Sequence, residues 1–284
     1  MIISFVILHY ENIVETVGCI NSILNLKSDF VKIIAVDNGS KKNRLSLIEE
    51  KYHHIPNVYF IHSEQNLGFA KGNNLGFEYA KYSLKSDIIV LSNNDIIYEQ
   101  NNFIEKLIEE FNEKKFDVAG PKIIRKFDGI NQNPEIKVFN TVQDVKRRIR
   151  NLRILYILGF FGLDNFFLKI FNRNFVYTNS NISIPEDYQL HGACLIFANN
   201  YIKKFDGLYN KTFMYGEESI LKYICDNNHL KMCYLPKLEI LHHEGASVGS
   251  TFGKGRDNRL FFYKNNIKSC LELVKLMKNE GIDN

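Results

Sequence analysis

The sequence lacks a strong net charge, a cysteine framework and a long apolar run, and each absence excludes a class of protein. With 36 basic and 32 acidic side chains the net charge is only +4, so we expect no nucleic acid among its partners. The five cysteines are scattered, form no C-x-x-C pair and are odd in number. This pattern favours free structural thiols in a reducing compartment over a disulfide scaffold.

No segment has the roughly 18 consecutive apolar residues of a membrane span. Residues 1–10 lack the basic start and the cleavage site of a signal peptide, so we predict a buried first strand and a cytoplasmic protein. The apolar segment 146–171 begins with the basic run 146–150 and is interrupted by charges and glycines. It is either an amphipathic helix or helical hairpin on the inner face of the cytoplasmic membrane, or an ordinary excursion packed on the core.

Short β-branched runs alternate with helix-spaced apolar segments, which predicts parallel strands joined by crossover helices. The predicted strands are residues 2–8, 31–36, 58–61, 88–91, 118–124, 182–184, 193–198 and 232–235. The predicted helices are residues 14–26, 45–52, 70–82, 103–111, 220–227 and 261–278. The sequence therefore predicts an α/β fold, in which ligands bind at the carboxyl ends of the strands.

Polar residues follow three of these strands. His9 and Tyr10 follow the first, residues 37–40 the second, and Asn93, Asn94 and Asp95 the fourth. Because carboxyl ends of parallel strands meet at one edge, we expect these residues to share a site. Asp37 suits hydrogen bonding to a base or ribose, although Asp-Asn-Gly-Ser is equally a good turn and helix cap.

The stretch 66–74 combines glycines, which permit close backbone approach, with a lysine and several amides. This composition suits contact with a diphosphate. The stretch has neither Walker spacing nor G-x-G-x-x-G, so it is not a P-loop or a dinucleotide fingerprint.

Two pairs of residues are candidates for the chemistry. Asp95 and His242 are suitable ligands for Mg²⁺ or Mn²⁺, with nucleotide phosphates as further donors, although each also suits an ordinary role as a turn residue or a buried histidine. Glu217 or Glu218 could take a proton from an acceptor hydroxyl. At the start of a helix both also favour the helix dipole, so capping is a rival explanation.

Together these motifs resemble those of family 2 glycosyltransferases with a GT-A fold, in the rhamnosyltransferase-like branch that builds bacterial surface polysaccharides. Residues 36–40 resemble V-D-N-x-S, and residues 64–74 followed by 91–95 resemble E-N-L-G-F-A-x-G-N-N and L-L-N-N-D. Residues 191–194, 213–218 and 242–247 are similar to S-G-A-C, F-M-Y-G-E-D and H-x-G-G-A-S. The resemblance runs from residue 1 to about 270, and the order of the motifs is more specific than any one of them.

The resemblance implies a Rossmann-like mixed sheet with flanking helices, organised in four parts. Residues 1–125 would form the nucleotide-sugar-binding half, and residues 126–180 a variable insertion that is the candidate membrane contact. Residues 181–255 would form the acceptor-binding and catalytic half, and residues 256–284 a C-terminal helix.

The resemblance also implies an inverting transfer of a sugar from dTDP-rhamnose or a UDP-sugar to a glycan or lipid-linked saccharide. Glu218 falls where the family has its base, with Glu217 beside it, and Asp95 with His242 would bind the divalent cation. The implied donor contacts are His9, Tyr10, Asp37, Asn38, Asn66, Gly68, Lys71, Asn74, Asn94 and Lys264. The implied acceptor contacts are His191, Gly192 and Ala193.

The sequence departs from the family pattern at several positions. Asn93 leaves one carboxylate fewer for the cation, Glu218 replaces an aspartate, His191 replaces a serine, and His243-Glu244 replaces a Tyr-Gly or similar pair. Two other functions stay open: a catalytically inactive sugar-nucleotide or glycan-binding module, and a nucleotidyltransferase. The latter would need a glycine-rich basic turn after the first strand, where residues 9–12 are His-Tyr-Glu-Asn. The motifs do not determine the oligomeric state, a homodimer included.

Overall fold

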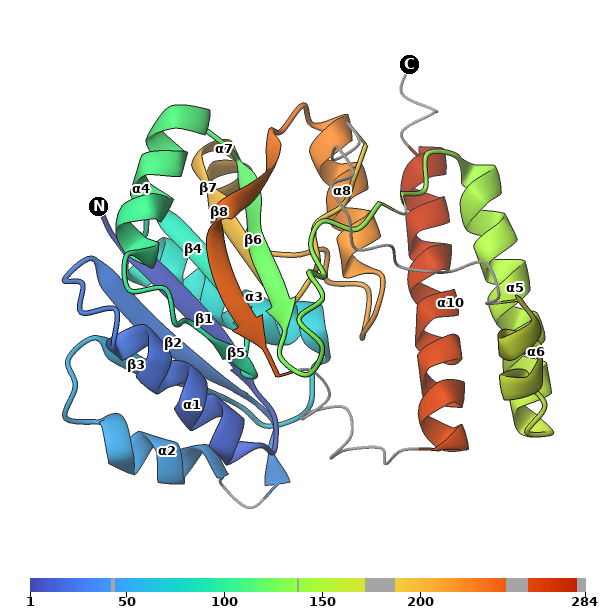
Figure 1. The fold of residues 1–284 in the computed structure, drawn as a ribbon, viewed down its shortest axis with the longest axis horizontal. Helices are drawn as coiled ribbons and strands as arrows, with labels where there is room; N and C mark the ends of the chain where they lie inside the picture. The colour runs from blue at the N-terminus through green and yellow to red at the C-terminus, as the bar shows by residue number, and fades with distance from the viewer. Residues whose placement is uncertain (42–43, 137, 172–186, 244–254, 280–284) are drawn as a thin grey trace.

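The structure, a computed structural model, describes residues 1–284 except 42–43, 137, 172–186, 244–254 and 280–284. The predicted strand 182–184 and most of the motif 242–247 lie outside the described residues. A mixed sheet of eight strands forms the centre of the molecule, and a group of long helices stands at one end (Figure 1).

Four parallel strands make up the first half of the sheet. They are β1 (Ile3–His9), β2 (Val31–Asn38), β3 (Val58–Ser63) and β4 (Ile88–Asn93). The second half contains β7 (Cys194–Ala198), β6 (Val118–Arg125), β8 (Met232–His242) and β5 (Ile96–Ile97). The strand order is β3-β2-β1-β4-β7-β6-β8-β5, with β7 antiparallel to both of its neighbours.

Helices cover both faces of this sheet. The helices around it are α1 (Ile13–Leu24), α2 (Arg44–Tyr52), α3 (Phe69–Glu78), which continues into the π-helical turn η2 (Tyr79–Ser83), α4 (Phe103–Lys114), α7 (Asn199–Lys204) and α8 (Glu217–Asn227). Phe5 of β1 packs in one core with Ile20 of α1 and Leu107 of α4. Its neighbour Val6 packs in a second core with Phe77 of α3, because successive side chains of a strand point to opposite faces.

The sheet curls back on itself at β5. Only Asn94 and Asp95 separate β4 from β5 in the chain, so the three residue steps from Asn93 to Ile96 span at most about 11 Å. Four strand steps in a flat sheet would separate β4 from β5 by about 19 Å. The sheet must therefore bend so that β8 and β5 return to the carboxyl end of β4, where Ile96 pairs with His242.

Most of the predicted elements are present, and the differences lie in the second half. The strand predicted to end at residue 235 continues to His242 as β8, although it contains Pro236. The pairing with β6 jumps from Leu235 to Glu239 at a bulge, so the proline lies where no ladder hydrogen bond is needed. Strand β5 and helix α7 were not predicted.

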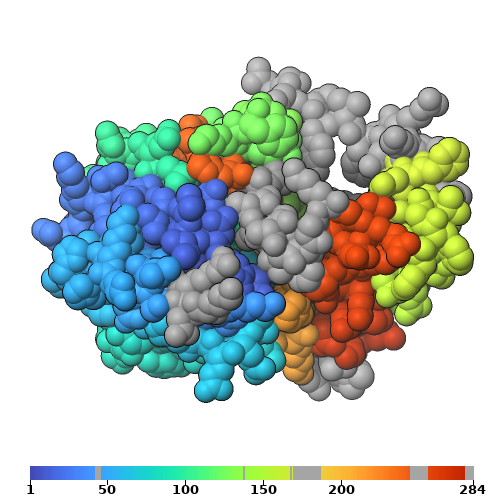
Figure 2. Space-filling view, turned by 90° about the horizontal axis from the view of Figure 1, so that it is seen from below, coloured from blue at the N-terminus to red at the C-terminus, as the bar shows by residue number. Residues whose placement is uncertain are grey.

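The long helices at one end are α5 (Val142–Phe160), α6 (Asp164–Phe171) and α10 (Arg256–Asn279). They have a core of their own, in which Val145 and Leu152 of α5 pack with Tyr263 and Leu273 of α10. Figure 2 shows α10 and α5 at the opposite end of the molecule from α1 and α2. Among the helices of the described residues, none is both long and apolar enough to cross a lipid bilayer.

Candidate active site

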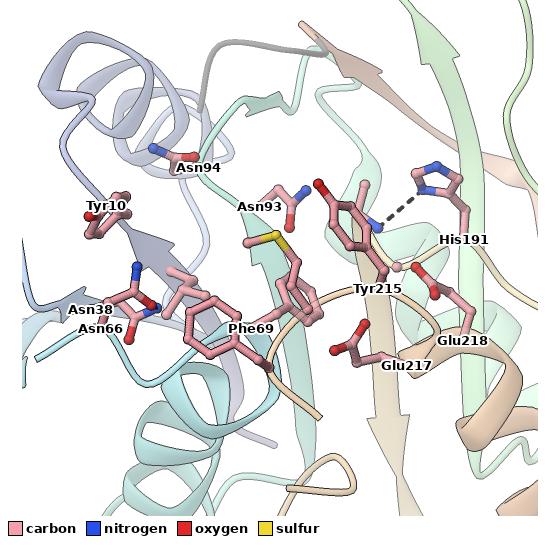
Figure 3. Close-up of a pocket in the computed structure, with 15 residues that line it drawn as sticks. Tyr10, Asn38, Asn66, Phe69, Asn93, Asn94, His191, Tyr215, Glu217 and Glu218 are labelled. Carbon is pink, nitrogen blue, oxygen red and sulfur yellow. Dashed lines mark hydrogen bonds between the residues drawn. The ribbon is translucent and has the colours of Figure 1, made fainter. Parts of the chain in front are cut away.

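A cavity opens at the carboxyl ends of β1, β2 and β4 and extends to the start of α8 (Figure 3). The cavity is open to solvent on one side, and both apolar and polar side chains form its wall. Its wall consists of Leu8, Tyr10, Asn38, Asn66, Phe69, Asn93, Asn94, His191, Gly192, Ala193, Phe213, Met214, Tyr215, Glu217 and Glu218. Nine of the predicted site residues lie in this wall: Tyr10, Asn38, Asn66, Asn94, His191, Gly192, Ala193, Glu217 and Glu218.

The wall on the β2 side is fixed by amide hydrogen bonds. Asn38 donates through Nδ2 to Asn66 Oδ1 at 3.2 Å and to the Gly68 carbonyl at 3.1 Å, and its Oδ1 accepts from the Leu67 N–H at 2.9 Å. Gly68 has φ of +84°, and a Cβ there would lie 2.2 Å from the Phe213 carbonyl oxygen. The Phe69 N–H donates to that same oxygen at 2.7 Å, so the loop before α8 is held directly against α3.

Six predicted donor contacts are not part of this wall: His9, Asp37, Gly68, Lys71, Asn74 and Lys264. Asp37 Oδ1 accepts from the Ser40 N–H at 2.9 Å, so its buried carboxylate closes the turn after β2. Lys71 on α3 and Lys264 on α10 are both exposed to solvent. Each lysine side chain extends into solvent, because other residues of its helix form the face that packs against the rest of the protein.

His9 and Asn74 also have structural contacts in place of a position in the wall. His9 Nδ1 lies 2.7 Å from Thr16 Oγ1, which in turn accepts from Asn94 Nδ2 at 3.0 Å. The buried Asn74 amide donates to the Leu208 carbonyl and accepts from the Leu208 N–H, both at 2.7 Å. Asn74 therefore attaches α3 to the chain after α7, and His9 orients the cavity residue Asn94.

The other side of the cavity is the turn that begins α8. Tyr215 and Gly216 have φ of 70° and 87°, a left-handed pair that directs the chain sharply into the helix. For tyrosine this conformation is strained, and such strain is concentrated at functional sites. Tyr215 packs edge-to-face on Phe262 of α10, with ring centroids 4.8 Å apart, which holds the turn in place.

Glu217 and Glu218 stand in the first turn of α8 but have different surroundings. Glu217 is 5% exposed and its Oε1 accepts from Thr212 Oγ1 at 3.0 Å. Burial raises the pKa of Glu217. Burial, with the charges of Glu217 and Glu135, raises the pKa of Glu218 to about 8, although the Gly192 N–H donates to its carboxylate. Desolvation thus outweighs the helix dipole, which would favour both charged forms.

His191 is a neutral hydrogen-bond donor in the same wall. Burial, and then the nearby His242 ring, lower the pKa of His191 to about 4, so the ring is uncharged at neutral pH. Its Nδ1 accepts from the Ala193 N–H at 3.2 Å, which requires the ring hydrogen to be on Nε2. His191 can therefore donate one hydrogen bond to a ligand oxygen.

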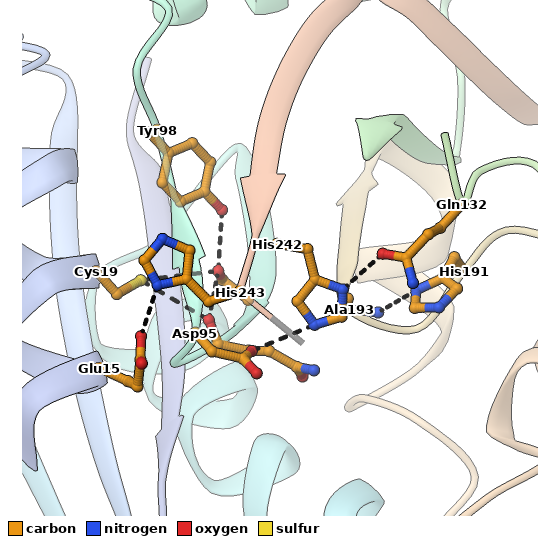
Figure 4. A network of polar contacts seen from close by, with 11 residues as sticks. Glu15, Cys19, Asp95, Tyr98, Gln132, His191, Ala193, His242 and His243 are labelled. Atoms are coloured by element: carbon orange, nitrogen blue, oxygen red, sulfur yellow. Dashed lines mark hydrogen bonds and ion pairs between the residues drawn. The ribbon is translucent and has the colours of Figure 1, made fainter. Parts of the chain in front are cut away.

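Beside this wall, Asp95 and His242 face each other (Figure 4). Asp95 Oδ1 lies 3.4 Å from His242 Nε2, and both side chains are almost fully buried. The adjacent His243 pairs with Glu15 of α1 at 3.1 Å. The rings of His242 and His191 are 5.9 Å apart, so the pair adjoins the cavity. Asp95 directly precedes β5 and His242 ends β8, so the β5–β8 pairing brings the two side chains together.

These two side chains fit a divalent cation. His242 Nδ1 lies 2.7 Å from Gln132 Oε1, which can only accept, so Nδ1 carries the hydrogen and a neutral ring presents the Nε2 lone pair to Asp95. Asp95 Oδ1 has no hydrogen-bond partner within the described part of the chain. Among the described residues no group of three or more His, Cys, Asp or Glu side chains surrounds a common point, so a cation here would need further oxygen ligands from a bound phosphate.

Sequence analysis did not identify several residues that shape this site. Gln132 lies in an irregular segment and orients His242 across 110 positions of sequence, for which no local pattern exists. Phe69 and Phe213, which line the cavity, lie within the stretches 66–74 and 213–218 described above. Tyr215 and Gly216 directly precede Glu217 and have left-handed backbone conformations. The Tyr-Gly pair before two glutamates was the one local signal for this turn.

Solved structures share this fold. The Staphylococcus aureus protein TarS, residues 1–349 in complex with UDP-GlcNAc, superposes with a TM-score of 0.54 at 16% identity, over 89% of this chain and 62% of that one. GalNAc-T7 with UDP, GalNAc and Mn²⁺ superposes with a TM-score of 0.58 at 14% identity, over 87% of this chain and 44% of that one. The chain thus spans less than two thirds of either structure, and the likeness establishes a GT-A fold alone.

The family of this chain is shown by its sequence. No curated protein matches the sequence. The model of the family described as "Glycosyl transferase family 2" matches residues 4–172, from β1 to the end of α6. This range contains the cavity wall after β1, β2 and β4 as well as Asp95. Because the match extends over more than half of the 284 residues, the chain belongs to glycosyltransferase family 2.

Proposed function

We propose that this protein transfers a sugar from a nucleoside diphosphate sugar to a hydroxyl group of a saccharide, with inversion at the anomeric carbon and with Glu218 as the base. The observation that carries the proposal is the position of Glu218. Its carboxyl group has a pKa raised to about 8, and Glu218 shares a cavity with Asn93 and with His191, a hydrogen-bond donor. The Asp95–His242 pair adjoins that cavity.

The proposed reaction is a single displacement. The acceptor hydroxyl gives its proton to a Glu218 carboxylate oxygen while the acceptor oxygen forms a bond to the anomeric carbon. The bond from that carbon to the diphosphate oxygen breaks, and the diphosphate leaves with the electron pair. Attack opposite the leaving group inverts the configuration. A base with this pKa is roughly one tenth ionised at pH 7, so turnover should rise with pH up to about 8.

Each remaining residue has a supporting role in this proposal. Glu217, held by Thr212, stays fixed beside the base and raises its pKa. His191 Nε2 would donate to an oxygen of the departing group or of the transferred sugar. Asp95 and His242 would hold Mg²⁺ or Mn²⁺, which when bound neutralises charge on the diphosphate.

The donor and acceptor are proposed at the level of chemical class. The UDP-GlcNAc in the TarS structure and the UDP in the GalNAc-T7 structure support a UDP-sugar. The motif resemblance alone supports dTDP-rhamnose. A glycan or lipid-linked saccharide of a bacterial surface polysaccharide is the proposed acceptor, in keeping with the rhamnosyltransferase-like motifs.

The test is a comparison of the Glu218→Gln and Glu218→Asp variants with the wild type. We expect Glu218→Gln to lose at least about a hundredfold in turnover, because an amide cannot accept the proton. Glu218→Asp should keep part of the activity, with its carboxylate one methylene short. Release of UDP, measured with donor and acceptor together, reports turnover.

The controls separate catalysis from folding and from donor binding. Stabilisation of Glu218→Gln by UDP and Mn²⁺ should equal that of the wild type, because the donor side is intact. Full turnover by Glu218→Gln would show that Glu218 is not the base. Donor binding without any UDP release by the wild type, over a broad set of acceptors, would favour an inactive binding module.

We also propose peripheral contact with an anionic membrane surface through α5 and α6. Large apolar side chains that are at least half exposed gather there: Ile154, Ile157, Phe160, Phe161, Leu163 and Phe166. Ile154, Ile157 and Phe160 lie on α5. The same helix carries the exposed basic side chains of Lys146, Arg147, Arg150 and Arg153. Apolar side chains that insert at the headgroup level beside cations that meet anionic lipids are the features of an interfacial helix.

Flotation with vesicles of phosphatidylcholine and phosphatidylglycerol tests this contact. We expect the wild type to float with the vesicles at low salt and Phe161→Asp to remain in solution. The control is Phe127→Asp, because Phe127 is as exposed as Phe161, at 77% against 75%, and lies in the turn after β6. Absence of the wild type from the vesicle fraction, or equal loss of both variants, would contradict the proposal.

A further inference from the structure

A second cavity lies on the other side of Glu218, between the start of α8 and the helices α5 and α10. Glu218 and Tyr215 belong to the walls of both cavities. Glu218 therefore stands between the two cavities, the one at the strand ends and this one. If the first cavity holds the donor, a nucleophile that gives its proton to Glu218 can enter through the second.

The second cavity contains a half-buried cation that has no counter-ion among the described residues. Arg148 of α5 lines it, and burial lowers the pKa of its guanidinium group. Within the described part of the chain, Arg148 makes no ion pair and no hydrogen bond. Burial of an unpaired guanidinium is costly, so such a group is a candidate for ligand binding.

Arg259 on the same group of helices shows how this chain neutralises a cation that serves structure. Its guanidinium donates to both oxygens of the buried Asp164, at 2.6 and 3.1 Å, and Tyr263 donates to the same carboxylate at 3.0 Å. The two arginines stand on helices that pack together, yet only Arg259 has a carboxylate partner among the described residues. Arg148 and Arg259 are both half-buried, but Arg148 lacks the partner that Arg259 has.

The acidic groups near Arg148 are engaged elsewhere. Glu135 accepts from Gln189 Nε2 at 2.7 Å, and Gln189 Oε1 accepts from Ser219 Oγ at 2.9 Å. Burial raises the pKa of Glu135, which reduces its negative charge. On α10, the Ser269 hydroxyl is buried and has no hydrogen-bond partner among the described residues. Arg148 and Ser269, neither of which has a partner among the described residues, therefore line one polar cavity that also has aromatic walls in Phe139 and Phe262.

We infer that this second cavity binds an acceptor saccharide that carries an anionic group, and that Arg148 contacts the anion. The inference rests on the proposed function and specifies its acceptor. The carboxylate of a uronic acid is planar and a phosphate on a sugar is tetrahedral. A guanidinium can bind either oxyanion through two hydrogen bonds. The aromatic rings would pack against the sugar, and one of its hydroxyls would reach Glu218.

Matched saccharides that differ only in charge test the inference without any transfer reaction. The probes are methyl glucuronide with its neutral methyl ester, and glucose 6-phosphate with methyl glucoside. Binding is measured by calorimetric titration in the absence of donor. We expect the wild type to bind at least one anionic member about tenfold more tightly than its neutral partner, as for a charge-assisted hydrogen-bond pair. The pair with the larger ratio identifies carboxylate or phosphate as the preferred anion.

Arg148→Gln should reduce this ratio to about one, and Arg148→Lys should retain part of it. The control is Arg147→Gln, because Arg147 is the adjacent residue on α5, is exposed and pairs with Asp144 at 3.5 Å. Stabilisation by UDP in Arg148→Gln shows that the fold of the donor side is kept. Equal binding of charged and neutral probes by the wild type, or an unchanged ratio in Arg148→Gln, would overturn the inference.

The outcome is independent of the identity of the base. Glu218→Gln should retain the preference for the anionic probe even if it has lost turnover. A charge preference that depends on Arg148 in a protein that transfers no sugar would support the binding site and contradict the proposed reaction. A wild-type protein that transfers sugar to neutral acceptors but shows no preference for the anionic probes would contradict the proposed anion site and leave the proposed reaction standing.

Discussion

The two sides of the first cavity use different chemistry. On the side of β2 and α3, uncharged amides form the wall and are fixed by short hydrogen bonds, as with Asn38 and the loop 66–68. On the side of α8, the wall consists of titratable groups with altered pKa values: Glu217, Glu218 and His191. The first side is suited to holding a ligand in one geometry, and the second to moving or donating a proton. Substitutions on the two sides should therefore fail in different ways.

The largest expected effect is at the junction of the two sides. Asp95→Asn removes the charge that would bind a cation, and we expect turnover to fall by about a thousandfold, or about 4 kcal/mol in barrier height. Stabilisation by UDP with Mn²⁺ should fall to that with UDP alone. Asp29→Asn, an exposed aspartate before β2, is the control. Wild-type turnover by Asp95→Asn would mean that this pair holds no catalytic cation.

Next in size is a substitution on the amide side. Gly68→Ala places a methyl group 2.2 Å from the Phe213 oxygen and adds left-handed strain, so we expect a loss of about 3 kcal/mol in unfolding free energy. Gly129→Ala is matched, with φ of +71° and no atom within 4 Å, and should lose only about 1 kcal/mol. Denaturant unfolding measures both. Equal losses would show that the contact with Phe213 is unimportant.

A glycine on the α8 side should respond in the opposite sense. A Cβ on Gly192 would lie 2.5 Å from Glu218 Oε1, the end of a side chain that can move. We expect Gly192→Ala to lose about tenfold in turnover, or about 1.4 kcal/mol in barrier height, with little change in melting temperature. Gly255→Ala, with no atom within 4 Å, is the control. A large loss of stability with unchanged turnover would reverse the comparison between the two sides.

The smallest effect concerns stability and pH. Because the folded-state pKa of Glu218 is raised to about 8 from 4.5, the folded protein keeps a proton that the unfolded chain loses. Wild-type stability from this group is complete below about pH 4.5 and is lost as pH rises to about 8. Glu218→Gln should therefore gain on the wild type between pH 5 and 8, by only about 1 kcal/mol over the whole range, because the side chain is half-buried and solvent screens most of the effect.

Urea unfolding of both proteins at several pH values measures this gain. The control is Glu78→Gln, an exposed glutamate on α3, which should follow the wild type at every pH. A constant difference between Glu218→Gln and the wild type from pH 5 to 8 would mean that Glu218 titrates normally.

How far the sequence predicted this arrangement depends on the range of each contact. Strands β1 to β4, and the residues that follow them, could be predicted because β-branched runs and strand-end polar residues are local patterns. The turn role of Asp37 was one of the two interpretations of Asp-Asn-Gly-Ser, and the hydrogen bond from Ser40 realises it. Helix α7 has only six residues, too few to show a helical period.

Contacts between distant segments could not be predicted. Strand β5 has two residues and exists only because β8 lies beside it, and β8 passes through a proline that a local pattern treats as an end. The isolation of Arg148 depends on which side chains of α8 and α10 surround it, so it appeared in the sequence merely as one member of a basic run. The conformation of Tyr215 depends likewise on its packing against Phe262.

The short ladder between β5 and β8 has a consequence for the time at which the protein becomes competent during synthesis. The segment from β1 to β4 emerges from the ribosome early and can pair within itself, since its strands follow one another in the chain. His242 is translated far later, and only then can it join Asp95. A nascent chain thus carries the cavity wall formed by β1, β2 and β4 but cannot bring Asp95 and His242 together until β8 has left the exit tunnel.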